Sequence, residues 1–340
     1  MLETIWFVLW GILWAVYFLL DGFDLGIGTL LPFLTKTENE RRTAYNAMGP
    51  FWDGNEVWLI TAGGATFAAF PGTYATMFST LYTPLMLLLF ALIFRGVSFE
   101  FRSKIDSKLW KQIWDVSMTA GSFLPAVLFG VAFANIFKGI PFDQYYVMQG
   151  NLWSLLNPYG LAGGILFALS FTYHGAIWLA LKSTGSLSEK SRKTAKKLWP
   201  VLAVAAVGFL SMSAKFTDLY DNYFQKPILF VIPVIAATGL VLSFLCVRTS
   251  LWLAWGFSGM WIVFSTLFGV AGLYPRLFPS SIDPGFSMTI ENSASSPLTL
   301  KIMLTVALIF VPIVIAYQVW AHYLFRHHIT DADLQKKESY

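Results

Sequence analysis

The chain has 340 residues, of which 56% are apolar, 17% aromatic and 12% charged, and its formal net charge is +4. Because soluble proteins carry about 25% charged residues, this composition excludes an ordinary soluble domain and predicts an all-α integral membrane protein. The single cysteine, Cys246, excludes an internal disulfide and any zinc or iron–sulfur site built from cysteines.

Nine apolar segments are long enough to cross a bilayer as helices. They cover residues 5–34, 52–70, 75–99, 113–137, 159–182, 197–214, 226–247, 251–274 and 299–326. No Lys or Arg precedes the first segment, and no small-residue cleavage site follows it. It is therefore expected to remain as a span rather than to be removed as a signal peptide.

An internal repeat divides these segments. Six residues between Gly11 and Gly22 recur between Gly164 and Gly175 at a constant offset of 153 residues, a register that puts His174 in the place of Asp21. Parallel repeats of this kind are related by an axis along the membrane normal. We expect one membrane domain made of two four-helix bundles, then a ninth helix with a tail, bounded at 1–137, 138–274 and 275–340.

Basic residues are distributed unequally between the two sides of the predicted bundle. Of the 23, 18 follow odd-numbered spans or lie in the tail, among them Arg95, Lys336 and Lys337, and five lie on the opposite side. The positive-inside rule then places the N-terminus outside and the C-terminus in the cytoplasm. The sequence pI near 9.0 reflects this topology, and no nucleic-acid partner is predicted.

Four carboxylates lie near the inner ends of the first two predicted spans. Asp21 and Asp24 share one helix face, and Asp53 and Glu56 begin the second span. Charges near lipid are costly and usually functional. The spacing of Asp53 and Glu56 also matches a capping box, in which both side chains bind free amide groups, so capping and proton handling stay open as alternatives.

Because a short loop joins the two spans, the four carboxylates are able to converge at one depth. Such a cluster suits either a hard cation or a hydrated entry point for protons. We favour proton handling, with Asp53, Glu56, Asp24 and Asp21 as the site residues, and predict no metal site.

Pairs of glycines within the spans indicate close helix packing. Gly22 and Gly26 form a small-xxx-small pair, which lets two helices approach closely in lipid. The pairs at 63–64 and 163–164 are interpreted in the same way. The spacing does not match G-x-G-x-x-G, so a nucleotide-binding loop is not predicted.

Four histidines, at positions 174, 322, 327 and 328, decide whether the chain itself is able to hold haem. Only His174 lies deep in a predicted span. Haem iron requires an axial ligand, but a single buried histidine is more often a hydrogen-bonded core residue. We therefore predict that this chain ligates no cofactor.

Five motifs spread along almost the whole chain carry a family resemblance. They are GFDLGIG at 22–28, WDGNEVWLITAGG at 52–64, FEFRSK at 99–104, LNPYGL at 156–161 and SSPLTL at 295–300. In this combination the sequence resembles subunit II of cytochrome bd quinol oxidase.

The resemblance implies a nine-helix subunit paired with a similarly folded subunit I in a bacterial or archaeal cytoplasmic membrane. Subunit I carries three haems, of the b and d types, and the loop that oxidises quinol; it reduces O2 to water, and the complex generates a proton motive force. Small single-helix accessory subunits are also implied. Subunit II stabilises the complex and contributes to the proton route, whose aspartate corresponds to Asp53. Many members have His in place of Phe51 and Gln in place of Glu56, so the resemblance assigns no role to Glu56.

Two other classes of protein share some of these features. A proton- or cation-coupled secondary transporter also has repeats and intramembrane acids, but its acids lie near the bilayer centre. A purely structural subunit needs no carboxylate cluster. The depth of the acids and the effect of replacing them distinguish these alternatives.

Overall fold

The computed structural model describes residues 1–335. Its α-helices are α1 Leu2–Leu34, α2 Glu38–Met48, α3 Trp52–Ala69, α4 Pro71–Thr80, α5 Tyr82–Phe101, α6 Lys108–Lys138, α7 Pro158–Lys182, α8 Gly185–Phe216, α9 Leu219–Gln225, α10 Val231–Cys246, α11 Leu251–Leu273, α12 Pro297–Leu324 and α13 Asp331–Leu334. Short 3-10 helices are η1 Leu152–Leu155, η2 Pro227–Phe230 and η3 Pro284–Phe286. Strands β1 Arg276–Phe278 and β2 Met288–Thr289 form an antiparallel pair between α11 and α12.

Eight helices of the described chain are long and apolar enough to cross a membrane: α1, α5, α6, α7, α8, α10 with η2, α11 and α12. The predicted all-α membrane fold is therefore confirmed, but the count of nine is not. The predicted span 52–70 is α3, whose 18 residues begin with a polar turn. The predicted span 75–99 is interrupted, since α4 ends at Thr80 and α5 begins at Tyr82.

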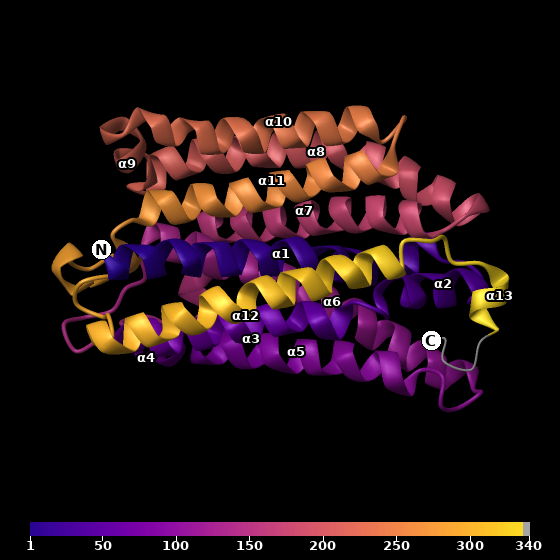
Figure 1. Ribbon diagram of the computed structural model, residues 1–340, viewed down its shortest axis with the longest axis horizontal. Helices are drawn as coiled ribbons and strands as arrows, with labels where there is room; N and C mark the ends of the chain where they lie inside the picture. Colours follow the sequence, from indigo (N-terminus) through magenta and orange to yellow (C-terminus); the bar gives the residue numbers. More distant parts are fainter. Residues whose placement is uncertain (336–340) are drawn as a thin grey trace.

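Helix α1 is the central helix of the bundle. It packs against α7 and α11 on one side and against α6 and α3 on the other, as Figure 1 shows. Its tryptophans Trp6, Trp10 and Trp14 are all buried. Because α1 contacts both groups of helices, they share one hydrophobic core, and the predicted division at residues 137 and 274 stays a prediction.

Glycines allow the closest helix contacts. A Cβ atom on Gly26 of α1 would lie 1.9 Å from the carbonyl oxygen of Phe171, and one on Gly175 of α7 would lie 2.6 Å from the nitrogen of Ile27. The interpretation of the 22/26 pair is confirmed, and so is that of the 163–164 pair, which approaches the α6 backbone. The interpretation of the 63–64 pair was wrong: outside the helix's own turns, no atom of the described residues lies within 4 Å of either added Cβ, because both glycines line an apolar groove.

A polar network fixes α2 against the ends of α5 and α6. The Arg102 guanidinium binds both carboxylate oxygens of Glu38 at 2.9 Å and approaches Asp115 Oδ1 at 2.6 Å. Arg41 also binds Asp115, and the Tyr45 hydroxyl donates to it. The hydrogen bonds from Arg102 hold the pKa of Glu38 below its usual value. These contacts fix the position of α2, which connects the end of α1 with the start of α3.

The close approach of α1 and α7 predicts that Gly26→Ala destabilises the protein by about 1 to 3 kcal/mol, because the added methyl group collides with backbone atoms. The measurement is the apparent melting temperature of the purified protein in detergent. Gly64→Ala is the matched control, since its methyl group meets nothing, and an equal loss in both variants would contradict the packing argument.

Candidate functional site

An arginine on α5 collects three of the four predicted carboxylates. Arg95 is fully buried, and its two terminal nitrogens bind the two oxygens of Asp21 at 2.6 and 3.0 Å. Glu56 Oε1 lies 2.9 Å from Nη1, and Asp24 Oδ2 lies 3.6 Å from Nη2. Residues from α1, α3 and α5 thus form one buried charged cluster.

Neutral side chains complete the cluster. Asn55 of α3 donates from Nδ2 to Asp24 Oδ2 at 2.8 Å and to the Leu20 carbonyl at 3.1 Å. The Tyr17 hydroxyl donates to Asp21 Oδ2 at 3.1 Å. Asp24 Oδ1 and Asn55 Oδ1 are buried and accept no hydrogen bond from the described residues. Asp21 is therefore fully occupied by donors, whereas Asp24 retains free hydrogen-bonding capacity.

The role of Arg95 was missed by the sequence analysis. It was assigned to the inner connection after the third span, but it lies within α5 and is 0% exposed. Arg95 is able to lie inside an apolar helix because neighbouring acids neutralise its buried guanidinium. The sequence contains one signal of this buried role: a single arginine within an apolar segment, with acidic residues in the neighbouring spans. Two other residues in that count, Lys336 and Lys337, lie outside the described residues.

Asp53 stands apart from the cluster. It is exposed, and its side chain forms no hydrogen bond or ion pair with any described residue. Three of the four carboxylates therefore meet at Arg95, whereas Asp53 makes no bond to them, and the convergence of all four at one depth stays a prediction. The capping box was wrong: α3 begins at Trp52, its N-cap residue Phe51 makes no side-chain cap, and Glu56 binds Arg95 instead. A capping box does form at Thr37 and Glu40 of α2.

The cluster has the chemistry of an ion-pair network. The guanidinium of Arg95 stands within contact of all three carboxylates, so it supplies the positive charge that a hard cation would bring. Within residues 1–335, no group of three His, Cys, Asp or Glu side chains has an arrangement that suits a metal ion.

The deep histidine is committed to the core. His174 is fully buried, its Nδ1 lies 2.6 Å from Ser258 Oγ and its Nε2 lies 3.2 Å from the Leu19 carbonyl. Its ring stacks on Trp255 at 5.5 Å. The interpretation of His174 as a hydrogen-bonded core residue is confirmed, and these contacts do not fit an axial haem ligand.

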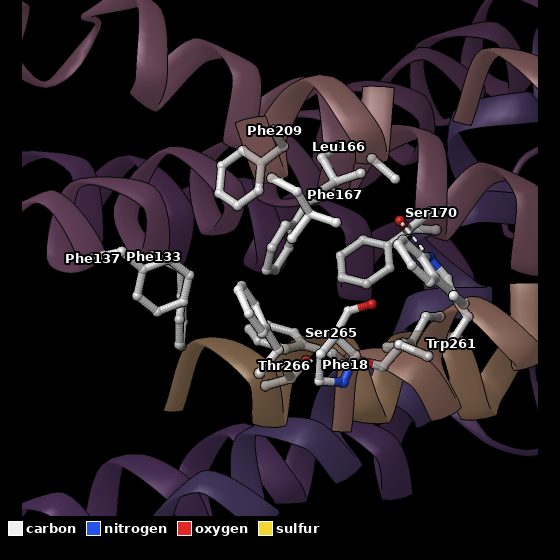
Figure 2. Close-up of a pocket in the computed structure, with 18 residues that line it drawn as sticks. Phe18, Phe133, Phe137, Leu166, Phe167, Ser170, Phe209, Trp261, Ser265 and Thr266 are labelled. Carbon is white, nitrogen blue, oxygen red and sulfur yellow. Dashed lines mark hydrogen bonds between the residues drawn. The ribbon is translucent and has the colours of Figure 1, made fainter. Parts of the chain in front are cut away.

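Two apolar hollows lie away from the acids. One has a volume of about 100 Å³. Figure 2 shows the phenylalanine side chains that surround it and Ser170, which accepts a hydrogen bond from Trp261. The other, of about 980 Å³, lies between α1, α3, α4, α5 and α6. The described residues that line them include no Asp, Glu, His, Lys or Arg. The acid cluster and Asp53 are therefore the candidate site for charge or proton chemistry.

Comparisons with known proteins agree along almost the whole chain. The family described as cytochrome bd terminal oxidase subunit II matches residues 2–325. Cytochrome bd ubiquinol oxidase subunit 2 of Bacillus subtilis (strain 168) is 36% identical over 329 residues, covering 97% of both chains. Cytochrome bd-I ubiquinol oxidase subunit 2 of Escherichia coli (strain K12) is 36% identical over 372 residues, covering 98% of this chain and 97% of the other.

A solved structure supports the fold. A chain of the bd oxidase from Geobacillus thermodenitrificans superposes with a TM-score of 0.76 at 16% identity, covering 95% of this chain and 98% of that chain. At this identity the likeness concerns the fold alone.

The geometry of the cluster predicts that Arg95→Gln destabilises the protein by about 3 to 5 kcal/mol, because it leaves buried carboxylates without their counter-charge. The measurement is the yield of folded, monodisperse protein from membranes. Arg248→Gln is the control, since Arg248 is exposed and pairs with no described residue. Equal yields of the two variants would show that Arg95 is not the neutralising group.

Proposed function

Because the chain belongs to the family of subunit II of cytochrome bd terminal oxidases, we propose that its acids help supply protons for oxygen reduction. The chain is a subunit of a terminal respiratory oxidase, an oxidoreductase complex of the cell membrane in which it partners subunit I. The reaction that we assign to the complex is quinol oxidation coupled to reduction of O2 to water. Membership of this family does not favour the secondary transporter.

Charge balance in the buried cluster is the observation that carries the proposal. Three carboxyl groups surround one guanidinium, so full ionisation would leave two negative charges without compensation. Each uncompensated buried charge costs several kcal/mol. The cluster is therefore expected to retain protons, and Asp24 is the best holder, because a proton on its free Oδ1 breaks no existing hydrogen bond.

Asp53 supplies the exchange point for these protons. It is exposed, and it lies three residues before Glu56 on the same face of α3. The Glu56 side chain is 19% exposed and binds Arg95. In the proposed route, Asp53 exchanges protons with water and with the partner subunit, while Glu56, Asp24 and Asp21 form the buried reserve behind it.

We also propose that protons arrive from the cytoplasm, with the N-terminus outside and the C-terminus inside. The distribution of basic residues supports this orientation. Removing Arg95 from the count leaves 17 basic residues on the inner side and five on the outer, so the bias keeps its direction. The charge separation that generates a proton motive force requires uptake from that side.

Haems b and d of the oxidase are proposed to reside in subunit I. Both ring nitrogens of His174 are hydrogen-bonded, and the cavity in Figure 2 offers no histidine, methionine or cysteine among its described lining residues. These residues do not fit an iron ligand. Single-helix accessory subunits remain an expectation from the family resemblance.

The proton route predicts that Asp53→Asn lowers quinol oxidase turnover at least about tenfold, because Asn keeps the size of Asp but does not titrate. The complex should assemble, and its haem spectrum should be normal. Turnover per haem of the purified complex is the measurement. Asp24→Asn is expected to lower turnover as well.

Asp106→Asn serves as the matched control, because Asp106 is almost fully exposed and, among the described residues, its carboxylate pairs with Lys111 alone. Its turnover should be unchanged. Near-normal turnover in an intact Asp53→Asn complex would reject Asp53 as the exchange point.

The proposed orientation predicts the activity of fused reporters. A reporter that is active only in the cytoplasm should be active when fused near residues 105 or 190 and inactive near residues 145 or 285. The measurement is reporter activity normalised to the amount of fusion protein. The reverse pattern would place the acid cluster away from the cytoplasm and refute the proposed proton entry.

A further inference from the structure

Helix α12 lies on the surface of the subunit and makes one polar contact across to α3. Only three of its residues, Leu300, Gln318 and Ala321, are buried. In Figure 1 it crosses the bundle in yellow, and it packs against α1 and α3. Gln318 donates from Nε2 to the carbonyl oxygen of Gly54 at 3.0 Å. Because an amide in an apolar helix is costly without a partner, this bond explains how Gln318 is accommodated there.

The bond from Gln318 is one of three polar contacts that hold the first turn of α3. Three consecutive residues each bind a different helix: Gly54 binds α12, Asn55 binds α1 and Glu56 binds α5. Asp53, the preceding residue, contacts no described side chain through a hydrogen bond or ion pair. The direction of its carboxylate therefore depends on how firmly its neighbours hold the backbone of this turn.

A second contact connects α12 with the residue that precedes α3. The His322 ring packs on the Phe51 ring with a centroid distance of 4.6 Å and an interplanar angle of 35°. Nδ1 of the same ring lies 2.9 Å from the Gln318 carbonyl. Helix α12 thus contacts the start of α3 on both sides of Asp53, at Phe51 and at Gly54.

We propose that Gln318 is a positioning residue for Asp53, acting through the Gly54 carbonyl. The inference rests on the proposed function, in which Asp53 exchanges protons. Gln318 does not itself carry a proton in this proposal. It holds the turn of α3 so that the Asp53 carboxylate keeps the direction in which it receives and passes protons.

Gly54 provides an independent way to disturb the same contact. A Cβ atom at Gly54 would lie 3.3 Å from Gln318 Nε2, which is closer than an ordinary contact, and outside its own turn of α3 it meets no other atom of the described residues within 4 Å. Gly54→Ala therefore shifts the amide by a few tenths of an ångström and disturbs its hydrogen bond, while leaving Gln318 in the chain. Ala also suits a helix better than Gly, so a loss of function in this variant would not come from weaker helix formation.

The test compares Gln318→Leu, Gly54→Ala and Asp53→Asn in the complete oxidase, purified from membranes and placed in liposomes. One turnover is started by adding O2 to the reduced enzyme, and proton uptake is followed with a pH indicator. Steady-state kcat, the KM for quinol, the pH profile of turnover and the haem spectrum are measured on the same samples. Tyr317→Phe is the control, because Tyr317 is the neighbouring residue on α12 and is 57% exposed.

Gln318→Leu and Gly54→Ala are each expected to slow proton uptake about threefold to tenfold, as loss of one hydrogen bond allows. The kcat should fall with the KM for quinol and the haem spectrum unchanged, and the pH profile should shift. Because both variants act on the same contact, which Gln318→Leu removes completely, the double variant should be no slower than Gln318→Leu. Tyr317→Phe should match the unaltered enzyme.

The outcomes separate the two proposals. If Asp53→Asn slows proton uptake and Gln318→Leu and Gly54→Ala do not, the positioning role is overturned and the proton route stands. If Asp53→Asn is also normal, the proposed function itself fails. If Gln318→Leu lowers only the amount of assembled complex, with normal uptake per haem, Gln318 is structural and the positioning role is overturned. If Gln318→Leu does not assemble, the rate of proton uptake in Gly54→Ala decides. Slow uptake supports the positioning role, and normal uptake overturns it.

Discussion

The buried ion pair between Arg95 and Asp21 is the contact on which the arrangement of the first helices depends. A fully buried guanidinium is stable only when acidic groups lie beside it in good geometry, and this arginine binds both oxygens of one carboxylate. That requirement brings α1 and α5 to one depth and draws the polar first turn of α3 inward through Glu56. Because an unpaired charge in an apolar helix is costly, the need to pair Arg95 fixes the relative positions of α1, α3 and α5.

Helix α1 carries the acids that pair with Arg95 and also packs against helices on both sides of the bundle. Asp21 and Asp24 face α3 and α5, whereas Gly26 allows the α7 backbone to approach so closely that a Cβ atom would collide with it. The helical repeat separates these functions, because residues three or four apart share a face and residues two apart do not. One helix therefore carries the acids on one face and the tightest packing on the other.

Exposure divides the acids into two kinds. Asp21 and Asp24 are sealed and held by named donors, while Asp53, next to the same cluster in sequence, faces outward with its neighbours Gly54 and Asn55 bound to other helices. A buried reserve beside an exposed carboxylate suits proton exchange, since the reserve retains protons and the exposed group contacts water. Under the positioning role proposed for Gln318, the surface helix α12 is also part of the site, because it binds the backbone of the turn that carries Asp53. It contributes no acid.

The sequence by itself determined the class of the molecule, most of its spans, the close helix packing at Gly22 and Gly26 and the family, because composition, segment length and motif spacing are local properties. It also pointed to the four acids. Only the tertiary structure decided which of them meet, because contacts between helices depend on rotation and depth, which hydropathy does not encode.

From the sequence, Arg95 was assigned to a connection between spans, but in the structure it lies on α5 and binds acids of α1 and α3. The capping pattern at Asp53 and Glu56 does not form, because Glu56 directs its carboxylate to the buried Arg95. Gln318 gave no sequence signal beyond a single amide in an apolar helix, and its partner, a backbone carbonyl 264 residues away, is visible only in the folded chain.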